Sequence, residues 1–508
     1  MRPTLRRSCN ACARSKLSCD LRKPKCSRCI KRRIGSCVYA NEPLTLSSTE
    51  PNAIEDSNSG SALPPASELL QPSPPRPLRL GFSQALDPFD SYPRTRLPRA
   101  RVQHLIQHFL SNIAFQYYPL DLGKSSNPFV VSWWPLALND PALFHVSLQT
   151  ASLDAELKAQ NGFKDSEMLM ADSIALVRQR FEDPLLACGD ETIDSVVTLA
   201  AIEFGKGNTA VGSMHIEGVK KMVQMRGGIH NLKLTSPLTA RMVAWVSLVL
   251  MQTPQFSVQN DHRCGDAIAP IQQWTEVDNV SHQELPECFV GLDLEPVLSD
   301  VVLRLRNILN TSRQSDLSTT DLHDLANFIL HRLCSLEPLN HQSFQVSPLS
   351  ECLRYAVVLY MLIIHGPTYF THAHLQLNLV SKLRARLEDT PDPVSVGHAS
   401  IALWVVSVGL VASADTPDGL WFHGQAQALG GYSDLHTWTD ILPHLEQVLW
   451  SGNHAAEAMF RQRWEAVLNA NPSHGCQLTF AASGVCRRQM EESESPYTKT
   501  CIRPSDYV

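Results

Sequence analysis

The feature that most constrains this chain is a run of six cysteines near its N-terminus, in CNACARSKLSCDLRKPKCSRCIKRRIGSC at positions 9–37. The spacing is Cys-x2-Cys-x6-Cys-x6-Cys-x2-Cys-x7-Cys. The six residues are Cys9, Cys12, Cys19, Cys26, Cys29 and Cys37. A Cys-x2-Cys turn can direct two sulfurs at one ion, and zinc takes four such ligands. The spacing therefore predicts a metal centre in a short segment that has few apolar residues of its own.

The number of thiols limits how many ions this segment can hold. Six thiolates leave two over for a single zinc, and two separate tetrahedral sites would need eight. Six suffice for two ions if two of the cysteines each bridge both. The near-repeat of a pair, six residues and a single cysteine favours this arrangement with pseudo-twofold symmetry, and Cys9 and Cys26 are the natural bridges. We predict two zinc ions, whose removal unfolds the segment because metal binding supplies its folding energy.

The N-terminus, MRPTLRRSCNAC, carries charge but no apolar h-region, so it does not predict a secretory signal. We therefore expect a reducing compartment, where clustered cysteines bind metal more often than they form disulfides. The alternative interpretation of the six cysteines is a disulfide knot or scattered thiols. A redox or zinc-storage role would leave the surrounding basic residues unexplained.

Charge is distributed unevenly along the chain. Residues 1–40 contain twelve Lys or Arg and a single acid, Asp20, which gives a net charge of +11, whereas the remainder carries −17. A basic head on an acidic body indicates a polyanion partner for the head alone.

Composition and periodicity divide the rest of the chain. Residues 41–97 are rich in Pro, Ser and Glu without periodicity, which predicts a disordered linker. Residues 98–475 are predicted to form a large helical domain, and 476–508 a flexible tail. No heptad register follows the cysteines, so the sequence offers no obvious coiled coil for a dimer.

Apolar residues recur at helical spacing through the predicted helical domain, as at Val102, Leu105, Phe109 and Ile113, and strand-like alternation is scarce. Asp140 and Pro141 predict the cap and first residue of a helix. Further helices are expected at 166–181, 191–204, 213–228, 238–251, 297–309, 353–364 and 455–468, so the predicted fold class is all-α. Two apolar runs, 356–366 and 399–415, do not predict membrane spans: the first is too short and the second is better read as a buried helix.

The six-cysteine pattern resembles the fungal binuclear zinc cluster (Zn₂Cys₆) DNA-binding domain, with a lysine at Lys16 after the second cysteine and a proline at Pro24 before the fourth. The resemblance implies that Cys9 and Cys26 bridge the two zinc ions. It also implies two short helices, the first entering the major groove, with Lys16 contacting bases of CGG-like triplets. A cationic side chain at a helix end can donate to guanine O6 and N7, and other cations contact phosphates. The candidate DNA-binding residues are Arg14, Lys16, Lys25, Arg28, Lys31 and Arg32.

Ala13, Ser15 and Ser18 stand where many members carry Arg or Lys, and in this respect CARSKLSC is similar to regulators of the aflatoxin-pathway type. The segments SNPFVVSWWPLALNDPALFHVSLQTASLDAEL and SMHIEGVKKMVQMRGGI resemble the fungal-specific transcription factor domain, a regulatory domain. Together these resemblances imply a nuclear RNA polymerase II transcription factor, an activator, with double-stranded DNA, a second copy of the chain and the transcription machinery as partners and no membrane association. They suggest control of a secondary-metabolite gene cluster. Repression, or regulation of primary metabolism, stays an open alternative.

Two other function classes are an enzyme and a protein-binding scaffold. An enzyme needs a catalytic constellation, and the chain has no Gly-x-Ser-x-Gly or His-Glu-x2-His motif. GNTAVGSM at 207–214 imitates a phosphate loop but lacks its lysine, so Gly212 is interpreted as a helix-entry turn. We therefore predict that the chain is not an enzyme. A metal-responsive scaffold that binds proteins instead of DNA remains the third possibility.

Overall fold

The computed structural model describes residues 12, 15, 27–32, 92–160, 162–259, 265–276, 286–309, 317–337, 347–366, 368, 372–390, 398–414 and 416–470. The chain divides into two units, Met1–Arg79 and Leu80–Val508. Regular secondary structure in the described residues is helical throughout, which confirms the predicted all-α fold class. The predicted linker up to residue 91 and the predicted tail lie outside the described residues.

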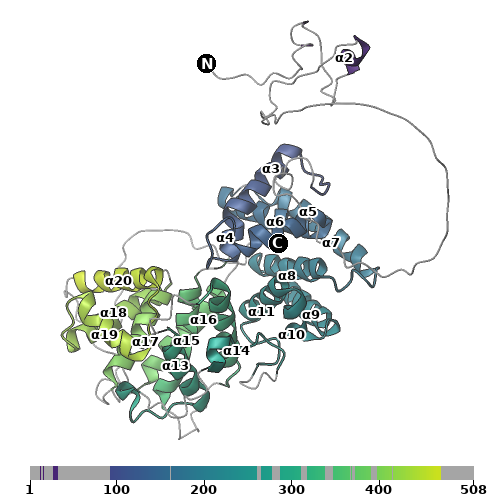
Figure 1. Cartoon of the computed structure of the whole chain (residues 1–508). Coiled ribbons are helices and arrows are strands. Elements are labelled where there is room, and N and C mark those ends of the chain that lie inside the picture. Colours follow the sequence, from purple (N-terminus) through teal and green to yellow (C-terminus); the bar gives the residue numbers. More distant parts are fainter. Residues whose placement is uncertain are drawn as a thin grey trace, which may run out of the picture. The chain divides into compact units, whose positions relative to one another are not determined.

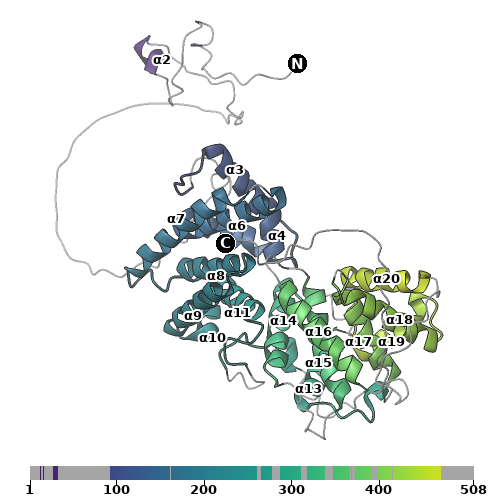
Figure 2. The same ribbon diagram turned by 180° about the vertical axis from the view of Figure 1, so that it is seen from behind.

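The first unit contains one described helix, α2 (Ser27–Lys31). The first half of the second unit is an N-terminal lobe, drawn in blue to teal in Figures 1 and 2. Its helices are α3 (Arg99–His108), η1 (Phe109–Ile113), α4 (Ala114–Tyr117), η2 (Phe129–Trp133), α5 (Trp134–Asn139), α6 (Pro141–Ala159), α7 (Lys164–Phe181), α8 (Asp190–Gly205), α9 (Thr209–Met225), α10 (Gly228–Thr235) and α11 (Pro237–Met251).

The second half is a C-terminal lobe, which lies beside the first and is drawn in green to yellow in both views (Figures 1 and 2). Its helices are α12 (Gln272–Glu276), η4 (Glu287–Phe289), α13 (Pro296–Leu309), α14 (Thr319–Cys334), α15 (Pro348–His365), α16 (His372–Asp389), α17 (Ala399–Ala412), α18 (Gly419–Tyr432), α19 (Trp438–Val448) and α20 (His454–Asn469).

Each lobe has its own hydrophobic core, and one helix belongs to both. Met242 and Val243 of α11 pack into the core of the N-terminal lobe. Trp245, Leu248 and Val249 of the same helix pack into the core of the C-terminal lobe. Helix α11 therefore contributes side chains to the hydrophobic cores of both lobes.

An ion cluster also joins the lobes. Asp324 of α14 is 4% exposed and accepts hydrogen bonds from Lys233 at 2.8 Å and from Arg241 at 2.8 and 2.9 Å. Burial alone would raise the pKa of this carboxyl, but the hydrogen bond from Arg241 and the charge of Lys233 lower it. The carboxylate is thus ionised and paired, as a buried charge must be.

Local sequence signals explain where several helices begin and end. The Asp140 side chain caps α6 by accepting from the Leu143 amide at 2.8 Å, and Pro141 is the first helical residue, as predicted. Helix α9 is followed by Gly227, whose φ of 83° is the left-handed conformation that commonly ends a helix.

The interpretation of Gly212 as a helix-entry turn is wrong. Gly212 lies inside α9, which begins at Thr209. A Cβ at this position would overlap the ring of Phe204 on α8. Close packing between α8 and α9, not turn geometry, therefore requires the glycine.

The assignment of residues 92–97 to a disordered linker also differs from the structure. Tyr92 stacks on Phe144 with ring centroids 5.6 Å apart, and Leu97 is 6% exposed within the N-terminal core. These two apolar side chains attach the segment to the helical body.

The apolar runs are buried helices. Helix α17 is confirmed as the buried helix expected at 399–415. The run at 356–366 is the end of the longer helix α15, and among the described residues α15 alone has the length and composition of a membrane span. Because 89% of that window is buried inside the protein, α15 has the surroundings of a core helix.

Candidate metal centre and DNA-binding module

Two of the six cysteines lie within the described residues, and both side chains are buried. Cys12 is 2% exposed and Cys29 is 0% exposed, and each is the second cysteine of a Cys-x2-Cys pair. Ile30, next to Cys29 in α2, is 59% exposed. Both described thiols therefore face the interior of this small unit, where metal ligands must lie, while the aliphatic side chain faces outward.

This arrangement fits zinc. Thiolates are common ligands of structural zinc sites, and a unit of this size needs the free energy of metal binding to fold. The other predicted ligands, Cys9, Cys19, Cys26 and Cys37, lie outside the described residues. Within the ranges that the structure describes, no three His, Cys, Asp or Glu side chains gather as metal ligands. The helical body therefore offers no competing centre over those ranges.

A hydrogen bond joins the two halves of the module. Arg32 Nη1 donates to Ser15 Oγ at 3.2 Å. Ser15 lies three residues after Cys12, and Arg32 lies three residues after Cys29. Equivalent positions of the two repeats thus face each other, as pseudo-twofold symmetry requires. The sequence prediction did not include this contact, although Ser15 and Arg32 follow the second cysteine of their pairs at the same spacing.

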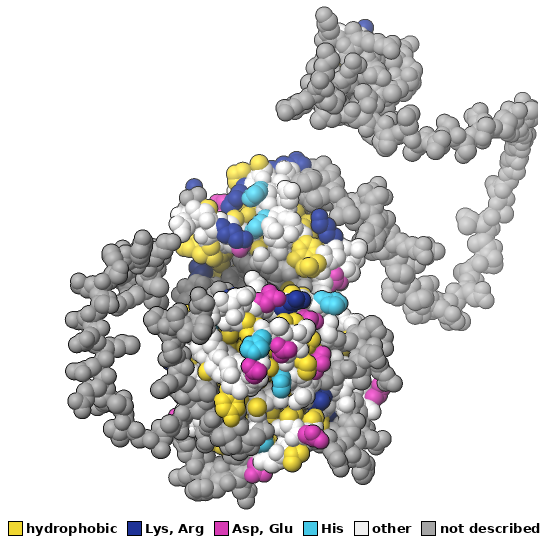
Figure 3. Space-filling view, turned by 90° about the vertical axis from the view of Figure 1, so that its left-hand side faces the viewer, with side chains coloured by type: hydrophobic (Ala, Val, Ile, Leu, Met, Phe, Trp, Pro, Cys, Tyr) yellow, Lys and Arg dark blue, Asp and Glu magenta, His cyan; other side chains and the backbone are white. Residues whose placement is uncertain are grey.

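The described cations of the module lie on its surface. Lys31, the last residue of α2, and Arg32 directly after it are both exposed. The side chains of the other candidate DNA-binding residues, Arg14, Lys16, Lys25 and Arg28, are outside the description. On the face of the molecule in Figure 3, acidic and basic side chains of the helical body are interspersed with apolar ones. The sequence concentrates positive charge in the module, where phosphates can meet it.

Buried thiols in a small cationic unit, followed by a large helical body, define a zinc-dependent DNA-binding protein with an appended regulatory domain. Comparison with known families agrees with this class. The family model described as "Fungal specific transcription factor domain" matches residues 104–475, and "Fungal Zn(2)-Cys(6) binuclear cluster domain" matches residues 7–46.

One curated relative matches the zinc module. The zinc finger transcription factor YRR1 of Saccharomyces cerevisiae is 51% identical over 41 residues. The match covers 8% of this chain and 5% of that protein's length. No solved structure matches the chain.

The chain belongs to the family of fungal-specific transcription factors with a Zn₂Cys₆ binuclear cluster. Membership of this family makes it a DNA-binding transcription factor and not an enzyme, and the binuclear cluster implies two zinc ions. The resemblances to the Zn₂Cys₆ domain and to the fungal-specific transcription factor domain are confirmed, and the likeness to regulators of the aflatoxin-pathway type stays a prediction.

Proposed function

We propose that the chain is a nuclear regulator of RNA polymerase II transcription that recognises CGG-like triplets. In this proposal all six cysteines of the segment 9–37 hold the two zinc ions, Cys9 and Cys26 each bridge both, and Lys16 contacts guanine. Arg14, Lys25, Arg28, Lys31 and Arg32 contact phosphates. Six thiols suffice for two ions only through bridging, and +11 within forty residues supplies the attraction to a polyanion.

The observation that carries the proposal is the burial of Cys12 and Cys29 in a unit that leaves Ile30 exposed. The hydrogen bond between Ser15 and Arg32 supports a symmetric pair of repeats around the metals. In such a unit the charged side chains have no interior to occupy and remain available to DNA.

The remaining assignments follow from the order of segments. We assign DNA binding to residues 1–40, a linker to 41–91, regulation to 92–475 and a tail to 476–508. A second copy of the chain and the transcription machinery are the proposed protein partners. Activation of a secondary-metabolite gene cluster is the proposed role, and repression or control of primary metabolism is the competing one.

A lysine substitution tests base recognition. The Lys16→Ala chain is expected to keep two zinc ions but to lose preference for CGG-containing over scrambled duplex DNA by about 1–3 kcal/mol, because one bidentate guanine contact is removed. Fluorescence anisotropy titrations of the two duplexes measure the preference, and metal analysis of the same protein measures zinc.

The matched control is Lys164→Ala, which removes an exposed lysine from the helical body. This variant should bind both duplexes as the wild type does. If Lys16→Ala leaves the preference for CGG-containing duplex unchanged, recognition of bases by this residue is refuted. If the variant also functions normally, the protein-binding scaffold is favoured. Wild-type affinity should also fall steeply with salt, since each phosphate contact releases counterions.

The direction of regulation needs a separate experiment. Bound sites are mapped across the genome, and transcripts are compared between wild-type cells and cells that lack the protein. Transcripts near bound sites should fall in the deletion if the protein activates, and a rise would establish repression. Bound sites within a biosynthetic gene cluster support the proposed role, and sites at genes of primary metabolism support the alternative.

A further inference from the structure

A cavity of about 380 Å³ lies inside the helical body, where the two lobes meet. Its walls come from α4, η2, α5, α8, α10, α11 and α14, and α11 is the helix shared by both cores. Ser132 and Leu136, which also line it, are exposed at the protein surface, so the cavity has a mouth. This volume and largely preformed shape are typical of small-molecule sites.

The walls are mostly apolar and aromatic. Tyr117 and Phe129 stack with centroids 4.9 Å apart on one side. Trp245 lines the cavity from α11 and stacks on His365 with centroids 4.1 Å apart. Stacked rings hold these surfaces in fixed orientations, which suits a flat ring system.

Three lining residues have a buried polar atom without a hydrogen-bond partner among the described residues. These atoms are Asp194 Oδ1, Trp245 Nε1 and His323 Nε2. Asp194 is 1% exposed and His323 is 5% exposed. Each unsatisfied group costs about 1–3 kcal/mol, which a ligand that supplies partners would recover.

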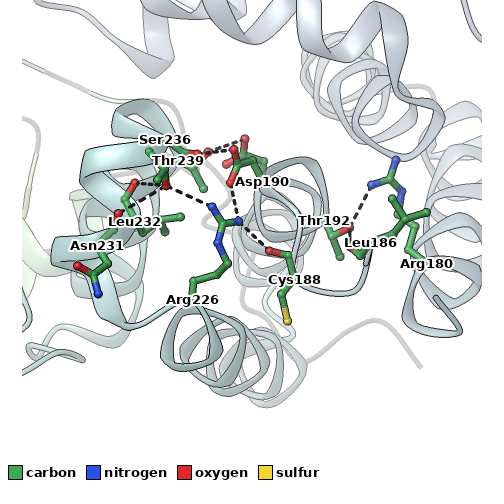
Figure 4. Close-up of polar contacts among 12 residues, drawn as sticks. Arg180, Leu186, Cys188, Asp190, Thr192, Arg226, Asn231, Leu232, Ser236 and Thr239 are labelled. Carbon is green, nitrogen blue, oxygen red and sulfur yellow. Dashed lines mark hydrogen bonds and ion pairs between the residues drawn. The ribbon is translucent and has the colours of Figure 1, made fainter. Parts of the chain in front are cut away.

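The charged lining residues already have partners. Arg241 pairs with Asp324, which Lys233 shares, and Asp190 accepts from Arg226 at 2.8 Å and from Ser236 (Figure 4). Burial raises the pKa of Asp194 well above its usual value, which favours the uncharged form of this carboxyl. No charged group in the lining is therefore left unpaired for a ligand of opposite charge, which favours an uncharged ligand.

We propose that this cavity binds an uncharged, mainly apolar ring compound that bears an oxygen acceptor. The rings of the compound contact Tyr117, Phe129 and Trp245, and its oxygen accepts from the indole N–H of Trp245. Hydroxyl or amide groups on the compound can pair with Asp194 and His323. The site is separate from the DNA-binding module and does not depend on it.

The test uses the full-length protein and prodan, an uncharged naphthalene ketone whose emission responds to polarity and hydrogen bonding. Saturable binding of one prodan per chain is expected. Ala201, which is 4% exposed, lines the cavity from α8, and Ala201→Phe should fill the space and weaken binding at least tenfold. Ala458→Phe places the same ring at an exposed position on α20 and should leave binding unchanged.

A second variant protects the test against a folding failure. Trp245→Phe keeps an aromatic wall but removes the N–H donor, so binding should weaken severalfold and the emission of bound prodan should shift to the blue. Absence of saturable binding, or wild-type binding by a folded Ala201→Phe chain, overturns the proposal and leaves a water-filled cavity. If Ala201→Phe does not fold, unchanged affinity and emission in Trp245→Phe overturn it. The Lys16→Ala chain must bind prodan normally, which separates this site from DNA recognition.

Discussion

At the scale of single residues, the zinc module buries thiols and exposes an aliphatic side chain. Cys12 and Cys29 occupy the interior and Ile30 the surface. As thiolates, Cys12 and Cys29 would need a metal to balance their buried charge. The proposed bridging positions, Cys9 and Cys26, should be the least replaceable, because each would belong to both ions.

Cys26→Ala should therefore lose both zinc ions and all sequence-specific DNA binding. Metal analysis of the purified full-length protein measures the first, and anisotropy with CGG-containing duplex measures the second. Cys188→Ala, which removes a half-buried thiol of the helical body, should retain two zinc ions. A Cys26→Ala chain that still holds two zinc ions would contradict the bridging assignment.

At the scale of helices, glycine has two distinct roles in this body. In α17, a Cβ at Gly409 would overlap the ring of Phe422, which is 0% exposed. In α9, a Cβ at Gly218 would meet nothing within 4 Å. The first glycine is required by packing between α17 and α18, and the second only weakens its helix.

The two positions give opposite predictions for the same change. Gly409→Ala should lower the free energy of unfolding by about 1–3 kcal/mol through overpacking. Gly218→Ala should raise it by about 0.5–1 kcal/mol through helix propensity. Urea unfolding followed by tryptophan fluorescence measures both, because all nine tryptophans lie between Trp133 and Trp464 in the helical body. Equal effects of the two variants would contradict this account.

The sequence predicts helices well where a cap and an apolar stripe coincide, as at Asp140–Pro141 and α6. Helix α14 is absent from the predictions although its sequence carries both signals. Ser318 and Asp321 form a capping box, and Leu325, Ile329 and Leu333 recur at helical spacing. Cysteine spacing predicts the metal centre, but the cavity needs residues from seven helical segments that only tertiary packing brings together.

At the scale of the whole molecule, charge is segregated between the ends of the sequence. Residues 1–40 carry +11 and the rest −17. An acidic body is repelled by DNA, so non-specific attraction is confined to the zinc module. The stability of the helical body also depends on pH, because some of its buried side chains take up protons in acid.

Stability of the helical body should fall as the pH is lowered from about 6.5 to about 4. Burial lowers the pKa of His323 and of His331 to about 4. In this window the unfolded chain takes up protons that the folded chain cannot, so acid favours unfolding, by at most about 3 kcal/mol for each histidine.

His331→Leu should remove one of these protonation sites and reduce the loss of stability between about pH 7 and about pH 5. Urea midpoints from tryptophan fluorescence at the two pH values provide the comparison. His230→Gln replaces an exposed histidine and should leave the pH dependence unchanged. An unaltered dependence in His331→Leu would refute the assignment.

Because α11 supplies side chains to two cores at once, neither lobe can melt while the other keeps its full interior. The lobes should therefore denature in one cooperative transition instead of two. The most protected backbone amides of the two lobes should exchange with solvent at the same rate. A destabilising substitution anywhere along α11 should accelerate this exchange in both lobes.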